Sequence, residues 1–492
     1  MGLMLGRGLV VLLFIAASVL SAQTLPSAAE ALEQLPRGHV WLSHVVRDLL
    51  PWWMTDTATG APEFRFPSTR CDDGSLYDEA RPCPEIRSNS WINPRNRYLV
   101  SLSRQTYVYG VLFHLTGDTH WLRLMRAGVE EIRGDWMDRE NGGMFTEWDA
   151  ASGTYGPRPA WRDPQQMGYG LLGMAFYYYL TRDGEALRDL LELKHYIIST
   201  YYDPELGALR WMKEDRGATR GDSLRLTAQL DQMNAYMVLL APLLDEPDRT
   251  NWINDLRGLS WIMLGKFYNA GENLFFLQAD RPEDLDPRVT GTDFGHTIKA
   301  LWMIRMTAQL AGDEPLEAFA ASAGLRVLER AYLPASGSWA QGIQAGGALN
   351  PDKSWWIYCE LDQFAASLAL AEPAAARYLS ATQDYWLKYF VDARTGEVWN
   401  GVAEATRLPI TTLPKQWQWK NGYHSLEHAL VSYITARQLA GEAATLYFAF
   451  PEPPPEERLR PYFYRGKAES VRRPEADDSG IPVWEVQFSG IK

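Results

Sequence analysis

The sequence predicts a mainly α-helical protein whose helical hairpins close into an (α/α)6 toroid, a double ring of six inner and six outer helices. Three observations lead to this prediction. Short polar turns recur at a nearly constant interval, a series of glycines follows the same interval, and segments that are apolar on every side alternate with amphipathic ones. Repetition of one structural unit at a fixed period is typical of repeat architectures.

The turns that end helices read LTGD, LTRD, DEPD and LAGD, and they close at equal intervals, at Asp118, Asp183, Asp248 and Asp313. Two further turns continue the series at Glu372 and Glu442, with slightly unequal steps. Glycines before extended segments recur in phase, at Gly143, Gly207, Gly271, Gly337 and Gly396. A unit of this length is too long for a tetratricopeptide-type repeat. An open solenoid remains the alternative to a closed ring.

Segments that precede the turns, such as 168–180 and 298–310, are apolar almost all round, which is typical of a buried helix. Segments that follow the turns are amphipathic: from Trp121 to Trp136 the apolar residues fall at steps of three and four. Each repeat therefore predicts an inner helix, a tight turn, an outer helix and a hairpin-like loop, and the segment near 38–50 supplies the missing outer helix. We expect the connecting loops to share one rim, near 139–160, 203–226, 268–293, 334–353 and 392–418.

Outside the ring, residues 1–22 predict a cleaved signal peptide, because Arg7 precedes an apolar run that ends near Ala22. An uncleaved anchor is the alternative, although the run is short for a membrane span. We therefore expect a periplasmic or secreted protein with no stable membrane insertion after cleavage. The remaining boundaries are expected at 23–94 (extension with the first outer helix), 95–444 (barrel) and 445–492 (Pro-rich extension with short strands).

The cysteines fit an oxidising compartment. Cys71 and Cys83 flank a polar loop and are expected to form a disulfide, whereas Cys359 lies in an apolar helix and is expected to be a buried thiol. The net charge of −13, with no long basic run, argues against a nucleic-acid partner, because phosphate binding requires clustered Lys and Arg.

Counting back from the turns identifies polar residues at similar depths in the otherwise apolar inner helices: Arg104, Gln166, Asn234, His296, Glu360 and His424. The amino-terminal ends of these helices converge on the ring axis and present unpaired N–H groups. Burying polar side chains without partners is costly. We therefore predict that this layer forms the floor of a pocket, although any single histidine of the set is also compatible with an ordinary core position.

Several stretches of the chain resemble the N-acylglucosamine 2-epimerase family, which includes cellobiose 2-epimerases and aldose–ketose isomerases. The matching stretches are SRQTYVYG (103–110), GGMFTEWDAASG (142–153), QQMGYGLLGMAFYYYL (165–180), GHTIKALW (295–302), WWIYCE (355–360) and WQWKNGYHSLEHAL (417–430). The resemblance implies an (α/α)6 barrel that interconverts mono- or disaccharides at C2 or between C1 and C2. It also implies that Arg104, Glu360, His296 and His424 occupy conserved site positions.

This chemistry suits the residues. Epimerisation at C2 removes the proton beside the carbonyl and returns one to the opposite face, and two histidines can share that task. Arg104 can stabilise the developing oxyanion. We expect Glu360, Gln166, Asn234, Tyr236, Trp356 and Trp419 to bind the sugar, with no cofactor and no metal, in a monomer or homodimer.

The chain departs from the family pattern in two places. Lys299 stands where the family has a glutamate three residues after the histidine, and the stretch NAYMV (234–238) has Tyr236 and Val238 where cellobiose 2-epimerases have a histidine. Three alternatives remain: a glycoside hydrolase or lyase, for which Glu360 and Asp362 are the available carboxylates; a zinc enzyme, because HSLEH (424–428) matches H-x-x-E-H; and a non-catalytic sugar-binding protein.

Overall fold

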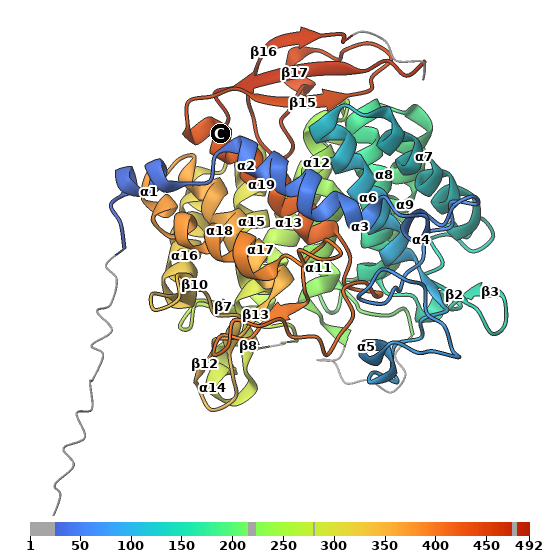
Figure 1. The fold of residues 1–492 in the computed structure, drawn as a ribbon, viewed down its shortest axis with the longest axis horizontal. Helices are drawn as coiled ribbons and strands as arrows, with labels where there is room; N and C mark the ends of the chain where they lie inside the picture. Colours follow the sequence, from blue (N-terminus) through green and yellow to red (C-terminus); the bar gives the residue numbers. More distant parts are fainter. Residues whose placement is uncertain (1–24, 215–222, 279–280, 475–479) are drawn as a thin grey trace, which may run out of the picture.

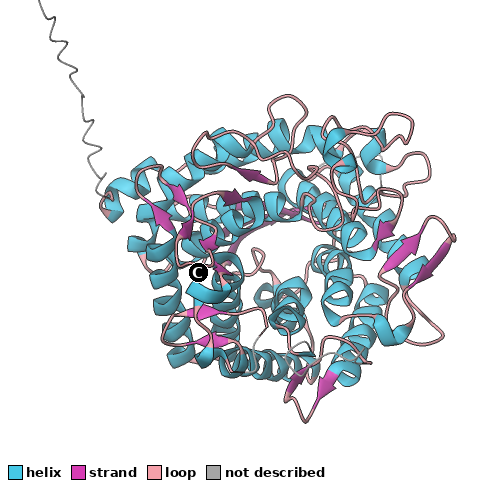
Figure 2. Cartoon of the chain, turned by 90° about the horizontal axis from the view of Figure 1, so that it is seen from below, coloured by secondary structure: helices cyan, strands magenta, loops and turns pink. Residues whose placement is uncertain are grey.

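The computed structural model describes residues 25–214, 223–278, 281–474 and 480–492, so the predicted signal peptide lies outside the described residues. Helices form two concentric rings (Figure 2). The inner ring consists of α6 (Leu99–Thr116), α8 (Pro164–Thr181), the continuous segment α11 (Leu226–Gln232), η4 (Met233–Met237) and α12 (Val238–Leu240), α15 (Phe294–Ala311), α17 (Trp355–Ala369) and α19 (Tyr423–Leu439). This arrangement confirms the predicted (α/α)6 toroid.

The outer ring follows the same order. It consists of α2 (Gly38–His44) with η1 (Val45–Leu49) and α3 (Leu50–Trp53), α7 (Thr119–Glu131) with η2 (Ile132–Trp136), α9 (Gly184–Tyr201), α13 (Asp248–Lys266), α16 (Glu314–Ala331), and η7 (Pro373–Tyr378) with α18 (Leu379–Tyr385) and η8 (Trp386–Phe390). The last inner helix, α19, packs against both α17 and α6, so the ring closes. Helix α2 packs against α19 and is the outer partner predicted near residues 38–50.

The regular period of the sequence has a local cause in the turns. Gly117 and Gly312 end inner helices in the left-handed conformation, which glycine adopts at little cost. Asp118, Asp183 and Asp313 then cap the following outer helices by accepting backbone N–H groups, which satisfies donors that the helix itself leaves unpaired.

Short strands occupy the rim at the amino-terminal ends of the inner helices, at the bottom of Figure 1, as predicted. Some of them pair within one connecting loop: β4 (Tyr202–Asp203) with β5 (Ala208–Leu209), β6 (Tyr268–Asn269) with β7 (Leu274–Phe275), and β9 (Tyr332–Leu333) with β10 (Ser338–Trp339). Other small sheets join neighbouring loops: β1 (Arg97–Tyr98), β2 (Glu147–Asp149) and β3 (Thr154–Gly156); β8 (Thr292–Asp293), β11 (Gly342–Ile343) and β12 (Leu349–Asn350); β13 (Lys353–Ser354) and β14 (Gly401–Val402). Short helices complete the loops and ends: α1 (Ala28–Gln34), α4 (Asp56–Thr59), α5 (Pro84–Arg87), η3 (Pro159–Trp161), η5 (Ala241–Leu243), η6 (Pro282–Asp284), α14 (Pro287–Thr290) and η9 (Glu456–Arg458).

The carboxy-terminal extension lies at the opposite end of the ring, at the top of Figure 1. It forms an antiparallel sheet in which β17 (Trp484–Ser489) lies between β15 (Ala444–Phe448) and β16 (Lys467–Arg472). Many of the aromatic residues belong to the core: the largest fully buried side chains include Trp41, Trp52, Trp53, Trp136, Trp302, Trp339 and Trp386. Among the described residues, no helix combines the length and apolar character that a membrane span requires.

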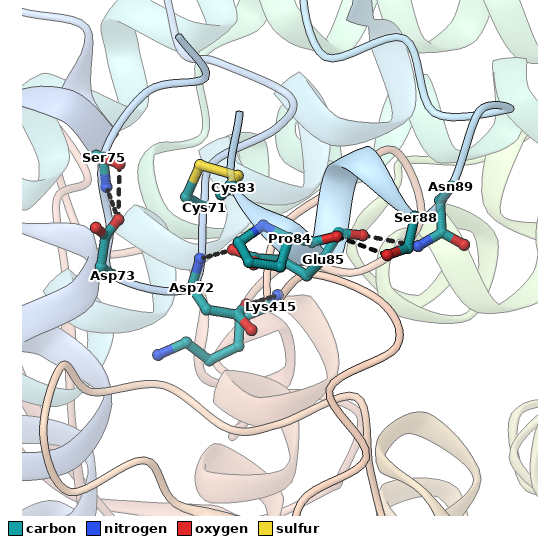
Figure 3. Close-up of a disulfide and its surroundings, with 10 residues drawn as sticks. All are labelled: Cys71, Asp72, Asp73, Ser75, Cys83, Pro84, Glu85, Ser88, Asn89 and Lys415. Atoms are coloured by element: carbon teal, nitrogen blue, oxygen red, sulfur yellow. Dashed lines mark hydrogen bonds between the residues drawn. A yellow bond between two sulfur atoms is a disulfide. The ribbon is translucent and has the colours of Figure 1, made fainter. Parts of the chain in front are cut away.

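Cys71 and Cys83 are joined by a disulfide, with their Cα atoms 6.0 Å apart (Figure 3). Cys359 is a buried free cysteine. The loop that the disulfide closes contacts the segment before α19. Asp72 accepts the backbone N–H of Lys415 at 2.7 Å, and the neighbouring Arg70 donates to the side chain of Gln416 at 2.7 Å. The disulfide loop therefore supports the segment that carries Trp419.

Replacing both cysteines by serine is expected to lower the free energy of unfolding by about 3 kcal/mol, because the unfolded chain regains the freedom that a loop of this length loses when it is cross-linked. Urea unfolding with and without a reductant measures this effect. Reductant should lower the midpoint of the wild type and leave the double variant unchanged. A wild-type midpoint that does not respond to reductant would show that the thiols are not paired in the mature protein.

Candidate active site

A cavity of about 190 Å³ lies among the first turns of the inner helices, and all six of them contribute to its wall. Its lining consists of Arg104, Gln165, Tyr169, Asp231, His296, Lys299, Trp355, Trp356, Trp419 and His424. The position of each residue within its helix explains why these side chains meet in one place. The sixth residue of each of the first five inner helices is polar, and these residues form one layer: Arg104, Tyr169, Asp231, Lys299 and Glu360.

His296 is oriented by the residue that caps its own helix. Asp293 precedes α15 and accepts the backbone N–H of His296 at 2.7 Å, while its second oxygen lies 2.8 Å from Nδ1 of the ring. Burial opposes ionisation of Asp293, but the contacts with His296 outweigh it and hold the pKa of this carboxyl below its usual value. A carboxylate at Nδ1 places the proton on that nitrogen, so Nε2 carries the lone pair and can act as a base.

Gly295 allows an indole ring to approach His296 closely. A Cβ atom at this position would lie 2.6 Å from the ring of Trp356. The ring centroids of Trp356 and His296 are 4.7 Å apart, and those of Trp356 and His424 are 6.2 Å apart. Trp356 therefore contacts both histidines and forms part of the wall between them.

His424 lies on α19 with its Nδ1 3.5 Å from Oε1 of Glu360. Burial, together with the positive charges of Arg104, Lys299 and Lys420, holds the pKa of His424 well below its usual value. The imidazole is consequently neutral at neutral pH. Whereas Nδ1 of His296 contacts Asp293, Nδ1 of His424 has no hydrogen-bond partner among the described residues that would support a positive charge.

Glu360 lies directly beneath the cavity lining and is fully buried. Burial raises its pKa to about 8; the negative charges of Glu427 and Asp231 add to this rise, and Lys299 opposes it. Glu360 therefore holds a proton at neutral pH, next to a neutral histidine. A buried acid beside an imidazole is able to donate that proton when the imidazole gives up its own.

Lys299 occupies the centre of the polar layer. Its Nζ donates to the hydroxyl of Tyr169 at 2.8 Å and to Oδ1 of Asp231 at 3.3 Å, and lies 3.6 Å from Oε1 of Glu360. Burial alone would favour the neutral amine, but Tyr169, Asp231 and Glu360 raise the pKa of Lys299 and keep it charged. The ammonium therefore neutralises Asp231, which would otherwise be a buried carboxylate without a counter-ion.

Arg104 stacks on Tyr169, with its guanidinium carbon 4.0 Å from the ring centroid, and donates from Nη1 to the carbonyl of Trp419 at 2.7 Å. Its Nε has no hydrogen-bond partner among the described residues. The guanidinium thus holds Trp419 in the cavity wall, and Arg104 itself lines the cavity.

Known proteins share this architecture. No family model matches the chain. A cellobiose 2-epimerase of Eubacterium cellulosolvens is 24% identical over 176 residues, which is 35% of this chain and 42% of the relative. Among solved structures, a cellobiose 2-epimerase from Bacillus thermoamylovorans matches with a TM-score of 0.66 and 15% identity, covering 81% of this chain and 98% of that one.

Two further solved structures match equally well. A cellobiose 2-epimerase from Spirochaeta thermophila has a TM-score of 0.65 and 16% identity, with 83% of this chain and 98% of that one covered. A D-mannose isomerase has a TM-score of 0.64 and 16% identity, with 81% and 97% covered. The chain therefore has the same fold as these sugar epimerases and this isomerase.

Within this fold, three of the residues predicted to bind the sugar lie away from the cavity. The side-chain amide of Gln166 donates a hydrogen bond from Nε2 to Oδ2 of Asp163 at 2.6 Å. The neighbouring Gln165 lines the cavity instead. Asn234 is buried and donates to the hydroxyl of Tyr423 at 2.9 Å. The ring of Tyr236 packs against Trp252 of the outer ring. The remaining predicted site residues line the cavity, except Glu360, which lies beneath it.

The start of the third inner helix explains why Asn234 and Tyr236 lie away from the cavity lining. This helix begins at Leu226, almost one helical turn farther ahead of its closing turn at Asp248 than α6, α8 and α15 begin ahead of theirs. A count back from the turn at Asp248 therefore gives a residue that lies too far along this helix to reach the cavity. Asp231, which lies three residues before Asn234 and was not predicted, occupies the equivalent site position and pairs with Lys299.

The geometry also bears on the zinc and hydrolase alternatives. His428 turns away from the cavity: its Nε2 lies 3.1 Å from Asp362, which also accepts a hydrogen bond from Trp339. The two histidines of HSLEH therefore do not converge. Glu360, His424 and Glu427 do bring ligand atoms within 4.8 Å of one another, in a geometry that could hold a metal ion, but the ammonium of Lys299 already supplies positive charge there.

Along the described cavity wall, Asp231 is the one carboxylate, and it is paired with Lys299. A glycoside hydrolase requires two carboxyl groups that flank the bond to be broken. The arrangement of two histidines with a buried acid behind one of them suits proton transfer at carbon better than hydrolysis.

Proposed function

We propose that the protein is a sugar 2-epimerase or aldose–ketose isomerase that moves a C2 proton through an enediolate, with His296 and His424 as the two proton-transfer groups. The observation that carries the proposal is the pairing of each histidine with a different carboxyl group in one cavity. Asp293 supports a base at His296, and protonated Glu360 stands behind neutral His424.

The first step uses His296. Its Nε2 takes the C2 proton of an open-chain aldose, the C–H electron pair becomes the C1–C2 double bond, and the carbonyl oxygen becomes an oxyanion that Arg104 stabilises. The imidazolium that forms is stabilised by Asp293, 2.8 Å from its Nδ1.

The second step uses His424. Its Nε2–H gives a proton to C2 from the other face; the electron pair of the C1–C2 double bond forms the new C–H bond, and the oxyanion becomes the C1 carbonyl again. Glu360 passes its own proton to Nδ1. The imidazole then remains neutral, as its depressed pKa requires. The charge appears on Glu360, where Lys299 at 3.6 Å stabilises it. Delivery of the proton to C1 instead of C2, with transfer of the C2 hydroxyl proton to the C1 oxygen, would give the ketose, so the same residues serve isomerisation.

An NMR screen of mono- and disaccharides in deuterated water tests the proposal. We expect deuterium at C2 of an epimerised aldose, or at C1 of a ketose. Tight binding with no exchange in any sugar would favour a non-catalytic sugar-binding protein. Release of a shorter sugar from an oligosaccharide would favour a hydrolase.

We also propose that the protein acts outside the cytoplasm. The apolar run before Ala22 and the pair Cys71 and Cys83 support this location, because disulfides persist in oxidising compartments. Amino-terminal sequencing of the protein from periplasmic and cytoplasmic fractions is the test, and an intact Met1 in the cytoplasmic fraction alone would contradict it.

A further inference from the structure

The carboxy-terminal extension reaches into the ring. We propose that Tyr462 of this extension is a positioning residue for the reaction, and that it acts by holding Glu427 beside His424 and Glu360. This inference rests on the proposed function. Tyr462 does not line the cavity, so its role is exerted through Glu427 rather than through contact with the sugar.

The segment Arg460–Tyr464, which we term the plug, lies at the end of the ring opposite the loop rim and contacts five of the six inner helices. The hydroxyl of Tyr179 on α8 donates to the carbonyl of Arg460 at 2.7 Å and accepts the backbone N–H of Tyr462 at 2.9 Å. The other contacts are those of Tyr462 with Tyr107 on α6, of Phe463 with Trp302 on α15, of Tyr464 with Ser367 on α17, and of Tyr462 with Glu427 on α19.

Tyr462 is aimed at one carboxylate oxygen. Its hydroxyl donates to Oε1 of Glu427 at 2.6 Å, and Tyr423 donates to the same oxygen at 3.3 Å. The backbone of Tyr462 has a φ of 60°, in the left-handed region that bulky side chains rarely adopt. Such a conformation persists only where the surrounding structure holds it, and it directs this side chain inwards.

Glu427 links the plug to the active site. It lies three residues after His424 on α19, and it belongs with Glu360 and His424 to a group whose oxygen and nitrogen atoms lie within 4.8 Å of one another. Burial raises the pKa of Glu427, while the hydroxyl of Tyr462, the charge of Lys299 and the hydroxyl of Tyr423 oppose that rise. Tyr462 therefore favours the ionised form of Glu427.

The charge on Glu427 in turn raises the pKa of Glu360, after the larger effect of burial. The two buried carboxyl groups thus compete for a proton, and only Glu360 lies beside Nδ1 of His424. By stabilising ionised Glu427, Tyr462 keeps the proton on the carboxyl group that can deliver it. The titratable and charged groups near Glu427 on the surrounding elements are Tyr107, Lys299, Cys359, Glu360, Tyr423, His424, Tyr462 and Tyr464. Of the two plug tyrosines, Tyr462 hydrogen-bonds to Glu427, whereas Tyr464 bonds to Ser367.

Comparison of Tyr462→Phe with Tyr464→Phe tests the inference. Both variants lose one buried hydroxyl from the plug, but Tyr464 bonds to Ser367 and not to a carboxylate. Tyr462→Phe should lower kcat about tenfold or more, the scale of a hydrogen bond to a charged group, with little change in KM. Tyr464→Phe should keep kcat close to that of the wild type. An equal loss of kcat in both variants would overturn the positioning role.

The pH profile of kcat distinguishes positioning from loss of structure. Without the hydroxyl of Tyr462, Glu427 holds its proton to higher pH and no longer raises the pKa of Glu360. The alkaline limb of the profile should therefore move to lower pH in Tyr462→Phe and stay in place in Tyr464→Phe. An unmoved limb in Tyr462→Phe would overturn the inference.

Thermal unfolding gives a readout that does not depend on activity. A hydrogen bond to ionised Glu427 contributes stability that is lost as the pH falls through the pKa of Glu427. The loss of Tm in Tyr462→Phe should therefore grow as the pH rises, and that in Tyr464→Phe should not. A loss that is independent of pH would overturn the contact with ionised Glu427. An inactive wild type would instead overturn the proposed function, together with the role of Tyr462 in turnover.

Discussion

Replacing His296 or His424 with asparagine is expected to lower kcat for epimerisation by about 10²-fold or more, the usual scale for a general acid–base group. Both side chains line the same cavity, and each is backed by a carboxyl group: Asp293 for His296 and Glu360 for His424. Asparagine preserves polarity and approximate size but cannot exchange a proton at the working pH. Initial rates with the sugar identified by the NMR screen measure the effect.

The two variants should differ in the fate of solvent deuterium. His296→Asn removes the group that takes the C2 proton, so the recovered substrate should contain no deuterium at C2. His424→Asn leaves that base in place, and deuterium should enter C2 of the substrate without inversion, because His296 returns it to the same face. His195→Asn, on the exposed side of α9, is the matched control and should behave as the wild type. Inversion at a normal rate in either site variant would exclude the two-histidine mechanism.

Replacing Glu360 with glutamine is expected to lower kcat by about 10²-fold and to remove the alkaline limb of its pH profile. The pKa of Glu360 is raised to about 8, chiefly by burial, so the group is protonated below this pH and loses its proton above it. Wild-type kcat should therefore fall as the pH rises through about 8. Glutamine has nearly the same shape and no charge, but it has no proton to pass to His424.

Asp362→Asn is the matched control, because Asp362 is also a buried carboxyl of α17 but turns away from the cavity to His428 and Trp339. This variant is expected to lose stability and to keep the alkaline limb. Activity rates between pH 6 and 10 and urea unfolding of both variants give the two readouts. A limb that persists in Glu360→Gln would assign it to another group and contradict the proton-delivery role of Glu360.

Much of the site was predictable because the inner helices are apolar except near their first turns. His296, His424 and Arg104 stand out in such helices, and the structure places all three on the cavity. Asp231 was within reach of the same argument, because it stands as far before the turn at Asp248 as His296 stands before the turn at Asp313. Aligning the starts of the helices, rather than their ends, would have identified it.

The partners of Lys299 could not be predicted in this way. The sequence of its own helix shows only that Lys299 is a cation about one turn after His296. The fold brings Tyr169 of α8, Asp231 of α11 and Glu360 of α17 around its Nζ. Whether a buried ammonium disrupts a site or neutralises it depends on the charges that surround it. Those charges belong to three other inner helices, far apart in the sequence.

The sequence by itself determined the ring, because the turns, caps and apolar periodicities that build each hairpin act between residues close together in the chain. The ring closure and the loop rim follow from repeating that hairpin. The tertiary structure alone decided which side chains meet at the axis. Gln165 lines the cavity, whereas the next residue of the same helix, Gln166, points to a different side. The plug brings Tyr462 into contact with Glu427, which lies on a different element. Such contacts arise from packing between elements, and no local propensity encodes them.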